Sequence, residues 1–365
     1  MGKISVVKTQ MGIKPALIRA LDLVGGLNCF VGRSDRIMLK PNLNGEEGYT
    51  DRNLVEALIQ LLMDSGVRSI SIGESTFGDA RMTDILFRKT GFADLAARYG
   101  ILLRNLNESE AIEVPVTRPL AAEKLRIARE VFEADRIINL PNMKVHYATG
   151  ITLALKNLKG LLVGDEKKRF HEIGLDKAIV DLNNTIRAHL QIADCISCME
   201  RMGPRGGDPV NLDLIMAGES AAEMDWVGCR IMCHDPAEIA HLRIFAEMNG
   251  ISFGEIEVLG EDLSAVMRPF KKAALHAVPP AGFHIHERNA CSACMNAFLL
   301  SCQFLDAGTD TVADFYLGSL PDARLSAGKF RIAFGNCVPE DENFDLRIKG
   351  CPPYPFALKG ALHKI

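Results

Sequence analysis

The chain has 365 residues, with a hydrophobic fraction of 48%, a charged fraction of 24% and a formal net charge of −4. These values are ordinary for a soluble globular protein, and the length allows two or three domains. The charge balance does not favour a nucleic-acid partner, and no apolar run approaches the roughly 18 residues that span a bilayer. Because the first residues show no signal-peptide pattern, we expect a cytoplasmic protein without a membrane partner.

Short apolar runs alternate with amphipathic stretches through the first two-thirds of the sequence. The pattern predicts helices at 14–27 and 53–66, and strands at 3–9, 36–42, 69–75, 136–142 and 212–218. This alternation indicates an α/β fold, with mostly parallel sheet layers and flanking helices. Past residue 270, prolines, histidines and cysteines become frequent. We therefore expect an α/β core at residues 1–270 and a small C-terminal cysteine-rich lobe at residues 280–365.

Polar residues gather where three of the predicted strands end. They are Lys40, Asn42 and Asn44 after the first, Glu74 and Ser75 after the second, and Lys144 and His146 after the third. In parallel sheets, ligands bind beyond the carboxyl ends of the strands. A shared cleft is therefore expected at this edge of the sheet.

The stretch 144–160, "KVHYATGITLALKNLKG", is apolar yet carries several cations. Ile151, Leu155, Leu158 and Leu162 recur at helical spacing and predict one buried helical stripe. Lys156 and Lys159 lie three residues apart and would share a neighbouring face. His146 precedes this predicted helix, where unpaired N–H groups favour an anion. The stretch predicts a phosphate or carboxylate site, although a solvated lysine face is the alternative.

Several of these motifs together resemble one known family. They are "KPNLN", "TDRNLVEALIQLL", "SIGES", "INLPNMKVH", "TGITLALKNLKGLL", "AIVDLN" and "MERMGPRGGDPV", in order over roughly residues 3–260. This set resembles the domain of unknown function 362 family, whose members are widespread in anaerobic bacteria and archaea and are often described as iron–sulfur cluster-binding proteins. The resemblance implies a fold and a cofactor class, but no established reaction.

A weaker likeness is to the lactate racemase family, which uses a nickel–pincer nucleotide. In that family a catalytic histidine, a cofactor-bearing lysine and a nickel-binding histidine follow one another at comparable intervals. His146, Lys156 and His171 stand ten and fifteen residues apart here. The residues around them do not clearly reproduce the racemase signature.

Four cysteines of the C-terminal lobe form the candidate metal site. Cys291 and Cys294 form a C-x2-C pair, Cys337 ends an apolar run, and Cys351 precedes a proline. Four thiolates commonly hold an iron–sulfur cluster, so we expect a 4Fe–4S cluster at these residues. Structural zinc is the alternative cofactor, and unliganded thiols are a third interpretation. Cys302 could replace Cys337 as a ligand, although its surroundings are typical of a buried apolar face.

The other cysteines compete as metal ligands or as a redox pair. Cys195 and Cys198 have C-x2-C spacing, and Cys229 and Cys233 lie four residues apart. We interpret these four residues, and Cys29, as small buried packing residues, because the family resemblance places small residues at the paired positions.

The sequence therefore predicts an iron–sulfur protein, an oxidoreductase or a cluster-assisted lyase, acting on an anionic small molecule. We assign catalytic roles to Glu74, Lys144, His146 and Lys156, and cofactor-binding roles to Lys40, Asn42, Lys159 and His171. A redox partner protein is the further partner that this function implies. Two alternatives remain: a nickel–pincer racemase or epimerase, and an electron carrier without substrate chemistry.

Overall fold

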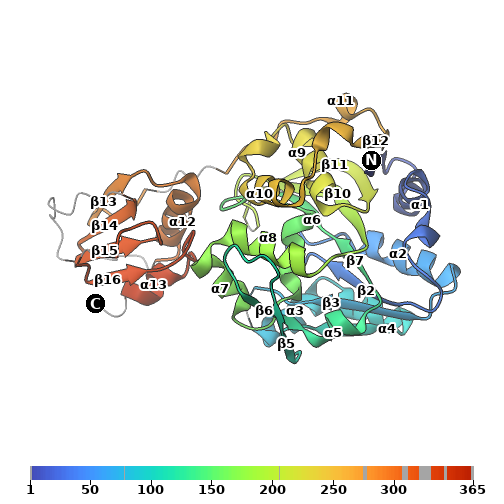
Figure 1. Ribbon diagram of the computed structural model, residues 1–365, viewed down its shortest axis with the longest axis horizontal. Helices are drawn as coiled ribbons and strands as arrows, with labels where there is room; N and C mark the ends of the chain where they lie inside the picture. Colours follow the sequence, from blue (N-terminus) through green and yellow to red (C-terminus); the bar gives the residue numbers. More distant parts are fainter. Residues whose placement is uncertain are drawn as a thin grey trace.

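The computed structural model describes residues 2–77, 79–204, 206–273, 278–305, 311–319, 330–340 and 343–362. Within these residues, ten strands form one large sheet, with the order β12-β1-β11-β10-β7-β2-β3-β4; β8 pairs with β10, and β9 pairs with β8 (Figure 1). Its strands are β1 (Lys3–Lys8), β2 (Arg36–Pro41), β3 (Ser69–Glu74), β4 (Leu102–Asn105), β7 (Arg136–Leu140), β8 (Asn142–His146), β9 (Gly150–Thr152), β10 (Leu190–Glu200), β11 (Asp208–Gly218) and β12 (Glu257–Gly260). The α/β fold class predicted from the sequence is confirmed.

The central strands β10, β7, β2, β3 and β4 are mutually parallel, whereas β11 runs antiparallel to both β10 and β1. The carboxyl ends of β2, β3 and β7 therefore meet at one edge of the sheet. Strand β7 stops before Pro141, and the chain continues as β8, which pairs with β10. His146 is the last residue of β8 and therefore lies beyond that edge. A short antiparallel ribbon of β5 (Ala111–Pro115) and β6 (Lys124–Ala128) lies outside the large sheet.

Helices cover both faces of the large sheet. Alternating residues of β2 divide between the two faces: Ile37 and Leu39 pack in one apolar cluster and Met38 in the other. The first cluster holds α1 (Ile13–Leu23), α2 (Arg52–Asp64), α3 (Ala80–Lys89) and α4 (Phe92–Tyr99). The second holds α5 (Arg129–Glu133), α6 (Ala154–Asn157), α7 (Glu166–Ile173), α8 (Leu175–Thr185), α9 (Ala221–Ile231), α10 (Ala240–Asn249) and α11 (Leu263–Val266).

The predicted continuous helix over 151–162 is wrong. The segment divides into β9, the single turn α6 and the 3-10 turn η2 (Leu158–Leu161). All four residues of the predicted stripe are nonetheless buried, at 1% exposure or less. The periodicity predicted the buried residues correctly but not their backbone conformation. The first residues of the predicted helix instead form β9, which pairs with β8.

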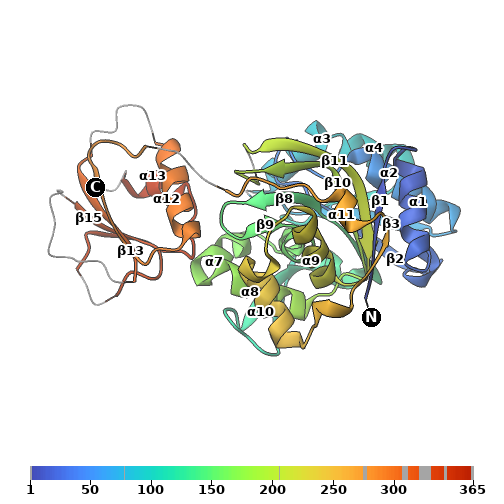
Figure 2. The ribbon, with the colours of Figure 1, turned by 90° about the horizontal axis from the view of Figure 1, so that it is seen from above.

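A second, four-stranded sheet follows the large one within the described residues. It is parallel and contains β13 (Phe283–Arg288), β14 (Ala313–Gly318), β15 (Phe330–Phe334) and β16 (Leu346–Ile348). Together with α12 (Ser292–Gln303) and α13 (Ala357–Leu362) it forms a small lobe beside the main body, facing α7 (Figures 1 and 2). The division into residues 1–270 and 280–365 stays a prediction.

Leu158 is 1% exposed and anchors η2 on the sheet, so Leu158→Ala should lower the free energy of unfolding by about 2–5 kcal/mol through lost contacts and a cavity. Chemical denaturation measures this change. Leu102→Ala is the matched control because Leu102 is 54% exposed, and its cost should be much smaller. Equal losses in the two variants would contradict the packing assigned to η2.

Candidate functional site

A cavity of about 550 Å³ lies at the carboxyl edge of the large sheet, where the small lobe meets it. The main body contributes Asn42, Leu43, Asn44, Glu74, Ser75, Thr76, Phe77, His146, Tyr147, Thr152, Lys156, Asn157, Lys159, Gly160, Lys167, His171, Met202, Pro204 and Gly206. The small lobe contributes Leu300, Gln303, Phe304, Tyr354, Pro355 and Phe356. One wall is thus rich in cations and amides, and the opposite wall is largely aromatic.

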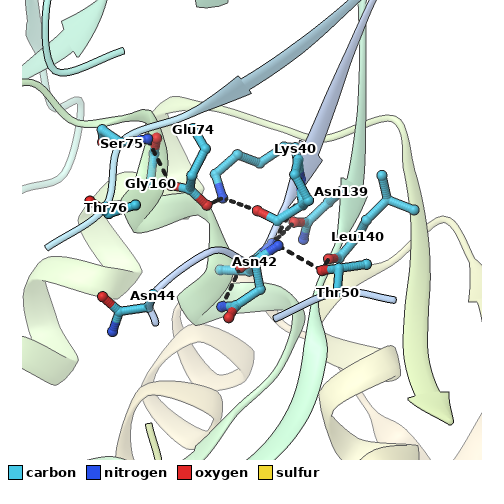
Figure 3. A network of polar contacts seen from close by, with 12 residues as sticks. Lys40, Asn42, Asn44, Thr50, Glu74, Ser75, Thr76, Asn139, Leu140 and Gly160 are labelled. Carbon is cyan, nitrogen blue, oxygen red and sulfur yellow. Dashed lines mark hydrogen bonds and ion pairs between the residues drawn. The ribbon is translucent and has the colours of Figure 1, made fainter. Parts of the chain in front are cut away.

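A buried ion pair lies at the base of the cationic wall. Lys40 Nζ donates to Glu74 Oε2 at 2.6 Å and to the carbonyl of Pro41 at 2.7 Å (Figure 3). Lys40 is fully buried and Glu74 is 4% exposed. Burial lowers the pKa of Lys40 and raises the pKa of Glu74, while the attraction between the two charges opposes both shifts. The pair joins the ends of β2 and β3.

Gly160 packs directly against this pair. A methyl group at this position would lie 1.8 Å from Glu74 Oε1 and 2.6 Å from Lys40 Cε. The carbonyl of Gly160 also accepts the backbone N–H of Ser75 at 2.9 Å. Only a glycine lets η2 approach the strand ends this closely, and the approach brings Lys159 to the cavity.

Asparagine side chains connect the strand ends to α6. Asn42 Nδ2 donates to Asn157 Oδ1 at 2.9 Å, and Asn157 Nδ2 donates to Asn139 Oδ1 at 2.8 Å. Asn42 Oδ1 accepts from Lys144 Nζ at 2.8 Å. Lys144 is fully buried and is not among the described residues that line the cavity. It donates to Asn42 from behind the wall, so its predicted place on the wall of this cavity is wrong.

The backbone N–H groups at the helix start are not free for an anion, contrary to the prediction from the sequence. The backbone N–H groups of Ala154 and Leu155 donate to the carboxylate of Asp225, at 2.6 and 3.2 Å. Asp225 is fully buried, and this desolvation raises its pKa to about 7. An internal carboxylate therefore already occupies the N-terminus of α6.

Three lysines line the cavity, and they differ in their partners. Lys167 Nζ donates to Ser75 Oγ, Asn107 Oδ1 and the carbonyl of Leu162, at 2.8–2.9 Å. In the described part of the chain, neither Lys156 Nζ nor Lys159 Nζ has a hydrogen-bond partner. Desolvation lowers the pKa of Lys156 and of Lys167 to about 8, and lowers that of Lys159 well below its ordinary value.

Two histidines complete the polar wall. His146 Nδ1 accepts the backbone N–H groups of Ala148 and Thr149, at 3.1 and 3.3 Å, which leaves Nε2 as the protonated nitrogen of the neutral ring. His171 Nδ1 lies 3.3 Å from the carbonyl of Pro352 in the small lobe. Desolvation and nearby lysines lower the pKa of both rings well below the ordinary value. Both rings are therefore neutral at neutral pH.

The sequence-predicted residues thus divide into two groups. The structure brings Asn42, Glu74, His146, Lys156, Lys159 and His171 to the cavity wall. Lys40 and Lys144 lie behind that wall, each bonded to one of its residues. Whether any of these residues binds or converts a ligand stays a prediction.

Sequence reasoning missed Lys167 and the aromatic wall. Lys167 stands four residues before His171 on α7, so the two share one helix face, and this spacing could have revealed it. Tyr354 and Phe356 follow the predicted ligand Cys351 closely. No pattern in the sequence indicated that these rings would turn to the strand ends of the other lobe.

The four cysteines of the candidate metal site, Cys291, Cys294, Cys337 and Cys351, all lie in the small lobe, and their role as metal ligands stays a prediction. Cys291 occupies the position before α12, and hydrogen bonds from the Cys294 thiol and from backbone N–H groups lower its pKa to about 6. The pKa of Cys294 is raised by its hydrogen bond to Cys291, by burial and by the nearby thiols of Cys351 and Cys337. No group of three His, Cys, Asp or Glu side chains among the described residues is arranged to hold a single metal ion.

The remaining cysteines follow the packing interpretation only in part. Cys195, Cys198 and Cys229 are buried at 2% exposure or less. Cys29 and Cys233 are exposed, so their interpretation as buried packing residues is wrong. Cys29 follows a glycine-rich turn at the surface, and Cys233 has a positive φ of 56° just after α9. Both sites lie in turns, whose side chains point outward.

The family assignment rests on residues 37–230, which match the model of the family described as "Domain of unknown function (DUF362)". This chain belongs to the DUF362 family. A thylakoid-associated protein of Synechocystis sp. is 30% identical to this DUF362 protein over 239 residues, covering 60% of this chain and 70% of the relative. The segment matched by the family model includes α6, η2 and α7, which carry the three lysines of the cationic wall.

Two solved structures are also similar to this DUF362 protein. The lactate racemase apoprotein of Thermoanaerobacterium thermosaccharolyticum gives a TM-score of 0.43 at 13% identity, covering 87% of this chain and 69% of that chain. A Thermotoga maritima protein gives 0.39 at 12% identity, covering 86% of this chain and 73% of that chain. With both TM-scores below 0.5, neither alignment defines an activity here.

Among the described residues, no helix combines the length and the apolar character that crossing a bilayer requires. The cytoplasmic location expected from the sequence stays a prediction.

Gly160→Ala should displace Glu74 or Lys40 and separate η2 from the strand ends, because the added methyl group has no space. We expect a clear fall in the unfolding midpoint. Gly360→Ala is the control: it lies in α13 with no atom near the added methyl group, and alanine there should be neutral or slightly stabilising. A Gly160→Ala protein as stable as the Gly360→Ala protein would contradict the packing at the ion pair.

Proposed function

We propose that this DUF362 protein is an iron–sulfur enzyme that acts on an anionic small molecule bound between its two lobes. The observation that carries the proposal is the cavity wall, where three described lysines face a single described carboxylate, Glu74. Glu74 is already paired with Lys40, which does not line the cavity. The wall therefore carries an excess of positive charge that an anionic ligand would offset.

The cysteine residues fit an iron–sulfur cluster. Cys291 titrates near 6, so its thiol is largely ionised at neutral pH, and thiolates are the ligands of such clusters. The nearby thiols of Cys291 and Cys337 help to raise the pKa of both Cys294 and Cys351, a repulsion that bound metal would relieve. These four residues would hold the cluster, which would supply one-electron transfer or a Lewis-acidic iron. Zinc, the alternative cofactor expected from the sequence, has less support, because no three His, Cys, Asp or Glu side chains among the described residues are arranged around one ion.

The cysteine site and the cavity are held together by the backbone. The N–H of Cys351 donates to the carbonyl of His171, and the carbonyl of Cys351 accepts the N–H of Leu175. His171 itself lines the cavity, as does Tyr354, three residues beyond Cys351. A cluster at Cys351 would therefore lie beside the ligand site. An electron carrier without substrate chemistry has no need of such a cavity.

A second candidate function is favoured by one observation. His146, Lys156 and His171 line the same cavity, as a nickel–pincer racemase or epimerase would require. That function needs a nucleotide covalently attached to Lys156. Intact-mass analysis of protein purified from its native host distinguishes the two candidates: an added mass mapped to Lys156 supports the second, and an unmodified Lys156 excludes it.

The metal content of anaerobically purified protein tests the cluster. We expect iron and acid-labile sulfide in comparable amounts, and their loss in Cys294→Ser because a ligand is removed. Cys302→Ser is the matched control on the same helix and should retain the metal, as should a Cys195→Ala/Cys198→Ala double variant. Stoichiometric zinc without iron after anaerobic reconstitution, or iron loss in the Cys302→Ser variant with retention in Cys337→Ser, would overturn the ligand assignment.

Sulfate titration by calorimetry tests the anion site. Lysine is charged below its pKa, and the pKa of Lys156 and of Lys167 is about 8, so sulfate affinity should fall as the pH rises through about 8. Sulfate keeps its charge across this range. Lys156→Ala should weaken sulfate binding roughly tenfold or more. Lys168→Ala is the control: Lys168 is exposed and follows Lys167 in the chain, and its replacement should leave sulfate affinity unchanged. Affinity independent of pH, or equal losses in both variants, would contradict the site.

A further inference from the structure

Lys40 and the three lysines of the cavity wall fall into two kinds. Lys40 is held by Glu74 and Pro41, and Lys167 donates to three acceptors, so both are fixed as hydrogen-bond donors. Lys156 and Lys159 line the cavity, and within the described ranges neither Nζ has a hydrogen-bond partner. Lys159 is buried and Lys156 is partly exposed, and both line the cavity, so a ligand bound there would meet both amines.

Burial and neighbouring charges favour the neutral amine of Lys159. Its residue is 9% exposed, and desolvation and the charges of Lys156 and Lys167 lower its pKa, against the attraction of Asp176. The rings of Phe77 and Phe170, whose centres lie 5.9 and 5.8 Å from Nζ, attract the cation and oppose this shift only in part. The pKa of Lys156 is lowered by desolvation and raised by the charge of Asp176, without a lowering contribution from another lysine. Lys156 therefore keeps more of its positive charge than Lys159 does.

We propose that Lys159 is a nucleophile that forms an imine with the carbonyl group of a 2-oxo acid in this cavity. The inference deepens the proposed function, on which it rests, by naming the class of the anionic ligand. A desolvated lysine beside other cations is the arrangement in which an amine attacks a carbonyl carbon at neutral pH. A 2-oxo acid combines that carbonyl with the carboxylate that a cationic wall binds.

The chemical step balances without a co-reactant. The Lys159 Nζ lone pair attacks the carbonyl carbon, and one amine hydrogen moves to the carbonyl oxygen to give a carbinolamine. The second amine hydrogen then leaves with that oxygen as water, and a C=N bond replaces the C=O bond. Lys156 and Lys167 are the cations that the carboxylate meets on the same wall, and His146 Nε2 is the donor left for the carbonyl oxygen.

Reductive trapping tests the imine. Pyruvate is added to the full-length protein with sodium borohydride, which converts an imine to a stable secondary amine, and peptide mass spectrometry locates the adduct. We expect labelling at Lys159 in the wild-type protein, at pyruvate concentrations that leave exposed Lys168 unlabelled. Acetone carries the same carbonyl without the carboxylate and should label far less. Adducts only on exposed lysines, an adduct at Lys156, or equal labelling by acetone would overturn the proposal.

Matched variants separate imine chemistry from binding. Lys159→Arg keeps a positive charge but cannot form an imine, so it should abolish the cavity adduct, while Lys168→Arg should label as the wild type does. The wild-type mapping keeps the test decisive even if Lys159→Arg folds poorly. Sulfate binding without an adduct refutes the imine alone, whereas absence of sulfate binding refutes the proposed function.

Discussion

The buried pair between Lys40 and Glu74 is the interaction on which the site depends. Its Nζ–Oε2 distance of 2.6 Å joins two neighbouring strand ends, and removing one partner would leave a buried charge at a cost of about 3–5 kcal/mol. Gly160 approaches the pair so closely that η2 must follow the geometry of the two strands. The contact of Gly160 with this ion pair thereby sets the positions of Lys156 and Lys159, although neither lysine takes part in it.

The two walls of the cavity come from different parts of the chain and differ in chemistry. The large sheet supplies lysines, amides and histidines, held by a network through Asn42 and Asn157, whereas the small lobe supplies aromatic rings. The backbone hydrogen bonds of Cys351 to His171 of α7 and to Leu175 of α8 connect the two walls. The arrangement places partly desolvated cations close to the cysteines of the small lobe, so the proposed anionic ligand and the proposed cluster would be neighbours.

Much of the α/β core could be predicted from the sequence, because buried strands and amphipathic helices have distinct periods. The grouping of Glu74, His146 and Lys156 followed from a rule of parallel sheets, that strand ends share an edge. The direction of a side chain at that edge does not follow from periodicity, which is why Lys144 was misplaced. Asp225 could not be foreseen as the cap of α6, because 71 residues separate Asp225 from Ala154. Contacts between the lobes have no local signal at all.

Anomalous diffraction from crystals grown anaerobically and soaked in selenate tests the central claim most directly, because it locates iron and the anion in one experiment. The account predicts an iron peak among Cys291, Cys294, Cys337 and Cys351, and a selenium peak in the cavity beside Lys156 and Lys159. Four cysteine sulfurs without iron in protein shown to be free of oxidation, or selenate bound only at surface lysines, would contradict it.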